Sequence, residues 1–243
     1  MSVFMLTFIL TGCSQTAGNS NDIILNTDKF ITCLFENKLE KAGELSLGIV
    51  KFNVLSNKTD FELEKGFNIE DIKLEPGFVS DNLAIVNSAV SYVDNVDGEY
   101  NMVFYEIRLL KEENEWRVYC LNETDPLFEN KGNRKTINPD TLNKKDFEKI
   151  FCGYTENLSN NRYQEASKYL IGRAKKMHKK ANPALGELNL VNDITELNTK
   201  VICAEKDNVV VRFDYKNNDK PMSVLVYFYL TGWGWRIYNV NQI

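Results

Sequence analysis

Histidine is almost missing from the 243-residue sequence, in which His178 is the single example. Histidine-based catalytic triads and zinc sites with several histidine ligands therefore lack the residue type that they need. The sequence also lacks the motifs H-E-x-x-H, G-x-S-x-G, G-x-G-x-x-G and C-x-x-C, together with the P-loop pattern of nucleotide-binding proteins. We therefore predict no catalytic residue, no metal site and no cofactor.

Excess positive charge and long apolar runs are missing as well. Lys and Arg number 29 against 34 Asp and Glu, which gives a net charge of −5 at pH 7 and predicts no nucleic-acid partner. The one stretch that is hydrophobic enough to enter a membrane is residues 3–10. It has less than half of the roughly 20 residues that span a bilayer, so we predict no transmembrane helix.

The segment L-T-G-C at residues 10–13, which follows this run, resembles the lipobox of bacterial lipoproteins. The resemblance implies that residues 1–12 are a signal peptide and that Cys13 carries a diacylglyceryl group and acyl chains such as palmitate. Two acyl chains give stable anchoring. Residues 13–21 would be a polar tether that holds the protein at the extracytoplasmic face of the cell membrane. No Lys or Arg precedes the apolar run, so we expect the true start codon to lie upstream, with Met1 an internal methionine. A buried N-terminal strand that ends in Cys13 is the alternative interpretation of this segment.

Three pairs of similar segments occur in the same order in the two halves of the chain. They are residues 37–42 with 161–166, 81–86 with 207–212, and 116–122 with 235–241. The last pair has Trp, Arg, Tyr and Asn at the same places. The common order and the offsets of 119 to 126 residues indicate an internal duplication, in which Trp116 and Trp235 are equivalent.

The spacing of apolar residues predicts helices first and strands afterwards in each half. In the first half we expect helices over residues 23–34 (capped by Asn21 or Asp22) and 39–47, and strands over 83–93, 102–110 and 116–121. In the second half we expect helices over 146–158 and 163–171, and strands over 200–205, 209–215, 223–230 and 235–240. Polar residues 126–139 are predicted to be a linker.

Helices followed by a sheet that ends in a W-R-hydrophobic-Y strand resemble the nuclear-transport-factor-like, or cystatin-like, cone fold. The resemblance implies an α+β chain of two tandem repeats, residues 22–125 and 140–243. Each repeat would pack N-terminal helices on a curved antiparallel sheet of about four strands. This fold hosts isomerases, hydrolases and binding modules, so it does not select a function.

The densest basic cluster lies at residues 173–180, next to the second predicted helix of the second half. Such a cluster can contact anionic lipid headgroups or cell-wall polymers. It can also be a solvated segment, because cations are favourable near the C-terminus of a helix. We favour the solvated segment.

Tyrosine is concentrated in the last strands, where Tyr227 and Tyr229 share a face by alternation. Together with Tyr215 and Asp214 they are our candidate lining of a pocket inside the second cone, and Asp214 would be the best catalytic candidate if the chain were an enzyme. Two alternatives remain open. The tyrosines can be core residues, and Arg212 can pair with Asp214 on an exposed face.

Four cysteines remain when lipid attachment uses Cys13, an even number for an exported chain. Pairing within the repeats would give the disulfides Cys33–Cys120 and Cys152–Cys203, each of which would stabilise the fold by roughly 4 kcal/mol. Free thiols packed in the core are the alternative.

These observations favour a non-enzymatic, membrane-anchored module that binds a protein, a polymer or a small molecule outside the cell. A small-molecule-binding protein or an isomerase-like or hydrolase-like enzyme that uses a cone pocket is one alternative, and a structural subunit of the envelope is another. An open cone lined by carboxylate and tyrosine would favour the enzyme. Cones filled by their own aromatic side chains would favour the interaction module.

Overall fold

In the computed structural model, the described residues are 16–56, 67–95, 98–126, 137–185, 194–205 and 207–243. Cys13, the predicted signal peptide and most of the predicted linker lie outside them. Within these ranges, no helix is both long enough and apolar enough to cross a membrane.

The two halves have the same order of elements. The first contains α1 (Thr16–Phe35), α2 (Leu39–Glu44), α3 (Gly48–Leu55), β1 (Phe67–Val79), β2 (Leu83–Asp94), β3 (Tyr100–Glu112) and β4 (Glu115–Thr124). The second contains a 3-10 helix (Pro139–Thr141), α4 (Lys144–Ser159), α5 (Tyr163–Ser167), α6 (Gly172–Leu185), β5 (Ile194–Ala204), β6 (Asn208–Asn217), β7 (Lys220–Thr231) and β8 (Gly234–Gln242). Each half forms a separate four-stranded antiparallel sheet in which sequence neighbours pair. The predicted α+β tandem architecture is confirmed.

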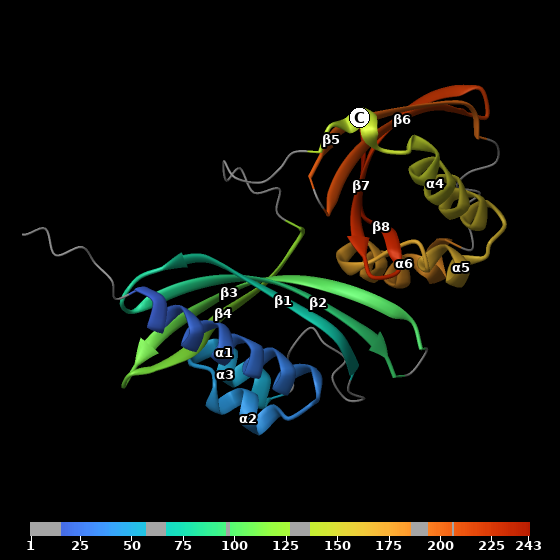
Figure 1. Cartoon of the computed structure of the whole chain (residues 1–243). Coiled ribbons are helices and arrows are strands. Elements are labelled where there is room, and N and C mark those ends of the chain that lie inside the picture. Colours follow the sequence, from blue (N-terminus) through green and yellow to red (C-terminus); the bar gives the residue numbers. More distant parts are fainter. Residues whose placement is uncertain (1–15, 57–66, 96–97, 127–136, 186–193, 206) are drawn as a thin grey trace, which may run out of the picture.

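Each sheet has one face covered by the helices of its own half. Figure 1 shows α1, α2 and α3 on one side of the curved sheet β1–β4, and the second half on the opposite side. The second half reaches this outward face of the first sheet through α6 and the end of the β7–β8 hairpin. The junction between the halves is therefore formed by outward sheet faces, and the cores under the helices take no part in it.

Helix α1 forms because its apolar side chains recur at helical spacing. Ile23, Phe30, Ile31 and Leu34 are buried against the first sheet. The helix begins at Thr16, earlier than the predicted cap, so the last residues of the predicted tether are helical.

Sequence patterns missed β1, α3 and α6. β1 is an exposed edge strand with two register shifts, one of them at Pro76 to Phe78, where a proline is tolerated because the edge needs no donor. α3 and α6 each begin at a glycine with positive φ, Gly48 (54°) and Gly172 (57°). These two glycines are equivalent in the duplication.

The backbone confirms the duplication in detail. The Leu47 N–H donates to the Val118 carbonyl at 2.8 Å, and the Ile171 N–H donates to the Ile237 carbonyl at 2.9 Å. In each half this bond attaches the segment after the second helix to the last strand. The same isolated parallel bridge therefore occurs twice.

The tryptophans of the repeated motif occupy equivalent places, as predicted. Trp116 pairs with Lys111 and Trp235 pairs with Leu230, each at the start of the last strand of its half. Both indoles pack on the helix-covered side of their sheets. A register shift follows at the corresponding point of each hairpin.

Aromatic side chains fill the space between helices and sheet in both halves. In the first half, Phe35 contacts Tyr92 with ring centroids 5.3 Å apart. In the second half, Phe151 stacks on Phe213 at 4.4 Å and 7° between planes. The interior of each cone is thus occupied by the protein itself.

Candidate functional site

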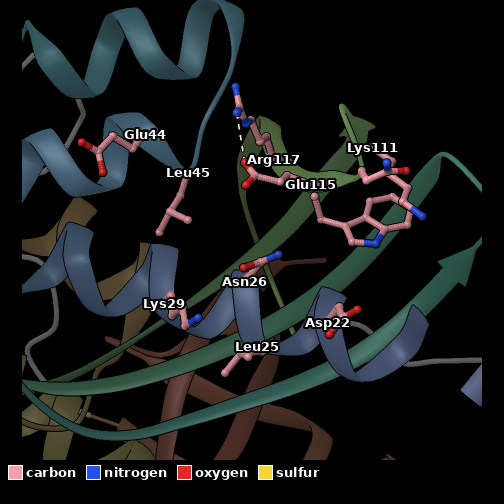
Figure 2. Close-up of a pocket in the computed structure, with 11 residues that line it drawn as sticks. Asp22, Leu25, Asn26, Lys29, Glu44, Leu45, Lys111, Glu115 and Arg117 are labelled. Carbon is pink, nitrogen blue, oxygen red and sulfur yellow. Dashed lines mark hydrogen bonds and ion pairs between the residues drawn. The ribbon is translucent and has the colours of Figure 1, made fainter. Parts of the chain in front are cut away.

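A cleft of about 350 Å³ lies on the first half, beside the β3–β4 hairpin. Figure 2 shows one wall formed by the middle of α1, another by the end of α2, and a third by the hairpin. Its lining residues are Asp22, Leu25, Asn26, Lys29, Glu44, Leu45, Lys111, Asn114, Glu115, Trp116 and Arg117.

The hairpin wall of the cleft is held by local interactions. Arg117 donates to Glu115 at 3.0 Å and forms an ion pair with Glu112 at 3.6 Å. Lys111 Nζ lies 5.9 Å from the centroid of the buried Trp116 ring, within cation–π range. This wall is therefore positioned before any ligand arrives.

The cleft carries three cations and three carboxylates, so its charges balance. On the helical walls, Asp22, Lys29 and Glu44 form no ion pair with any described residue. A surface of this kind suits a polar partner with charges of both signs. Among the described residues, no group of three His, Cys, Asp or Glu side chains is placed to bind a metal ion.

The structure does not gather the four predicted pocket residues into one site. Tyr215 lies on the helix-covered side of the second sheet, 5.7 Å from the Phe151 ring. Asp214 lies on the opposite face, where it accepts hydrogen bonds from Arg212 Nε at 2.8 Å and from the Ser223 hydroxyl. These two donors lower the pKa of Asp214. The structure thus has the salt-bridged arrangement that was the alternative for Asp214.

Tyr227 and Tyr229 share a face, as alternation predicted, and that face points away from the helices. Tyr229 is buried against Phe104 of the first half, with ring centroids 4.9 Å apart. Tyr227 lies next to Tyr238, at 5.9 Å between centroids. These tyrosines belong to the junction between the halves.

The junction has an apolar centre and polar contacts around it. Its buried centre consists of Met102, Phe104, Ile171, Tyr229 and Tyr238. Tyr100 stacks on Trp233 at 4.9 Å and 19° between planes. The Asn101 side-chain oxygen accepts a hydrogen bond from the Gly172 N–H at 3.0 Å. Residues from both sheets and from α6 thus fix the contact.

Three residues of α5 and α6 converge on one carboxylate of the first half. Lys175 Nζ lies 2.9 Å from Glu99 Oε2, and the Lys179 ammonium lies 3.3 Å from the same oxygen. The Ser167 hydroxyl donates to Glu99 Oε1 at 3.1 Å. Lys175 also donates to the Tyr100 carbonyl at 2.7 Å. Burial opposes ionisation of Glu99, but the hydrogen bond and charge of Lys175, together with Lys179 and Ser167, outweigh it and lower the pKa of this carboxyl group.

The basic cluster at residues 173–180 is therefore not a solvated segment throughout. Its residues form α6, in which Lys175 is only 2% exposed and His178 is buried. His178 Nε2 lies 2.9 Å from the Tyr163 carbonyl, which ties α6 to α5. The expectation failed because the ion-pair partner of Lys175 is in the other half of the chain. The duplication gave no signal for a helix here, because α3, the equivalent helix of the first half, was not predicted either.

The four described cysteines are free thiols in the structure. Cys33 and Cys152 lie on α1 and α4, and Cys120 and Cys203 lie on β4 and β5. Burial raises the thiol pKa of Cys152 and of Cys203. The proposed bridges are not formed here, and oxidation to them remains a prediction.

No protein-family model matches the chain, and no curated protein matches it. One similar solved structure is described as an Ntf2-like protein involved in plasmid conjugation, with 10% identity, 90% of this chain and 94% of that chain covered, and a TM-score of 0.33. Another is a cystatin-like protein from Ruminococcus gnavus, with 9% identity, 93% and 89% coverage, and a TM-score of 0.29. Neither likeness is close enough to assign a function.

Proposed function

We propose that this protein is a non-enzymatic binding module, held at the extracytoplasmic face of the cell membrane by a diacylglyceryl group on Cys13. The observation that carries the proposal is the aromatic filling of both cones. Phe151 stacks on Phe213 between the helices and the sheet of the second half, and Phe35 contacts Tyr92 in the first half. An isomerase-like or hydrolase-like activity would need that space.

The polar cleft of the first half is the surface that we assign to the partner. α1 begins three residues after Cys13, and Asp22 of the cleft lies on its second turn. At 1.5 Å per residue, Asp22 is about 9 Å along the helix from Thr16. A lipid on Cys13 would therefore keep the cleft close to the membrane, where the partner is a protein or polymer of the envelope.

The anchor is tested by labelling cells with a palmitate analogue and separating membranes from soluble proteins. We expect the wild-type chain to be labelled and to stay in the membrane fraction after a high-salt wash. The Cys13→Ala chain should be unlabelled and soluble, because no described helix is able to span a bilayer. Cys203→Ala, which removes an exposed cysteine, is the matched control and should behave like wild type. A Cys13→Ala chain that stays in washed membranes would contradict the anchor.

The cleft is tested with a photo-crosslinking residue placed at Leu25, which lines it and is 50% exposed. We expect a discrete crosslinked product in intact cells. The same probe at Met177 on α6, 61% exposed and outside the cleft, is the control and should give none. Equal products from both positions would count against the cleft. A native mass spectrum with a stoichiometric mass excess on the purified chain would instead support the small-molecule alternative.

A further inference from the structure

The duplicated W-R motif places an arginine at the same position of the last strand in both halves. In the first half, Arg117 is neutralised by Glu115 at 3.0 Å and Glu112 at 3.6 Å. The equivalent positions in the second half hold Gly234 and Thr231. Arg236 therefore keeps the place of Arg117 but has neither of its carboxylate partners.

Arg236 lies at the junction between the halves. It pairs in register with Tyr229 on the outward face of β7–β8, and its side chain is half-buried. Its one side-chain hydrogen bond within the described chain goes from Nη1 to the Trp235 carbonyl at 2.9 Å, and no described carboxylate forms an ion pair with it. Burial lowers the pKa of this guanidinium, whose ionisable neighbours are Tyr100 and Tyr169. A guanidinium has five donors, and one of them makes this single hydrogen bond to the described chain.

The surroundings of Arg236 suit a bound ligand. Tyr100 stacks on Trp233, with ring centroids 4.9 Å apart. Trp233 is 57% exposed, so this aromatic pair lies at the solvent edge of the junction. A half-buried cation without a counter-charge is destabilising, and an incoming anion would remove that cost.

We propose that Arg236 binds an oxyanion, a carboxylate or phosphate group, at the junction of the two halves, beside the Tyr100–Trp233 pair. The planar guanidinium fork matches such groups in a bidentate manner. Because Tyr100 comes from the first half and Arg236 from the second, the anion also strengthens the contact between the halves. This site is separate from the cleft on α1 and does not depend on the lipid anchor.

The test titrates the lipid-free Cys13→Ala chain with inorganic phosphate or with acetate at constant ionic strength, and follows tryptophan fluorescence. We expect a saturable change for at least one anion, and the preferred anion identifies the ligand group. Arg236→Gln should weaken that affinity about tenfold or more, because a charge-assisted hydrogen bond is lost. Arg108→Gln, which removes an arginine already paired with Glu106 at 2.8 Å and outside the cleft, is the matched control and should leave it unchanged.

A second measurement separates this role from a structural one. In anion-free buffer, Arg236→Gln should have a thermal midpoint equal to or above that of the parent chain, because an uncompensated charge is removed. At saturating anion the parent chain should become the more stable. The proposal would be overturned by the absence of a saturable response in the parent, by an equal response in Arg236→Gln, or by a lower midpoint of Arg236→Gln without anion.

Discussion

At the scale of single residues, the junction depends on a buried lysine that faces a carboxylate of the other half. Lys175 is almost fully buried, and its ammonium contacts Glu99 and the Tyr100 carbonyl. Removing one member of such a pair leaves the other buried and uncompensated, which costs far more than removing a surface pair. The neighbouring Lys176–Glu123 pair, at 2.7 Å but with partly exposed side chains, provides the comparison.

We predict that Lys175→Met lowers the free energy of unfolding by about 3 kcal/mol, the low end for a broken buried pair, because Lys179 still faces Glu99. Lys176→Met should cost about 1 kcal/mol or less. Urea denaturation followed by circular dichroism measures both. Equal losses of unfolding free energy in the two variants would show that the buried pair contributes no more to stability than the surface pair.

At the scale of elements, patterns near in sequence were predictable and long-range ones were not. The β3–β4 and β6–β7 hairpins follow from alternation and from turn residues that tolerate positive φ, such as Asn114 at 68° and Asn218 at 51°. β1 has few buried side chains and carries Pro76 and Gly77, so alternation does not reveal it. α6 buries the charged side chain of Lys175, so the spacing of apolar residues does not predict this helix.

Prediction of the candidate site was limited in the same way, because local patterns do not report long-range contacts. Alternation placed Tyr227 and Tyr229 on one face, but it could not show that this face meets Phe104 of the other half. The cleft beside α1 joins three distant segments through charged residues, a combination that no local pattern reports. That Thr231 and Gly234 replace the two carboxylate partners of Arg117 is visible in the sequence only after the two halves have been aligned.

The equivalent glycines that begin α3 and α6 allow an element-scale test. Both have positive φ, so alanine at either position costs about 1 kcal/mol or more in backbone strain. A Cβ at Gly48 meets nothing within 4 Å, whereas one at Gly172 lies 3.2 Å from the Met102 carbonyl across the junction. We predict that Gly172→Ala is the more destabilising by about 1 kcal/mol. Equal midpoints of denaturation for the two variants would contradict this close approach.

At the scale of the whole molecule, each half has its own core, and the junction adds a third, smaller apolar cluster. The cores lie under the helices, while the junction uses the outward faces of the sheets. A side chain of the junction can therefore be changed without touching either core. Phe104 is such a residue, since it is 6% exposed and packs on Tyr229 and Tyr238 of the other half.

We predict that Phe104→Asp lowers the unfolding midpoints of both halves, because the apolar junction surface of each half is then no longer covered by the other half. Phe213→Ala, inside the second core, should lower mainly the midpoint of the second half, by the cost of a large cavity. Fluorescence of chains that retain only Trp116 or only Trp235 reports the two halves separately, because the two indoles have equivalent places in different cores. If Phe104→Asp moved one midpoint and left the other unchanged, the two halves would be independent units that share a chain without stabilising each other.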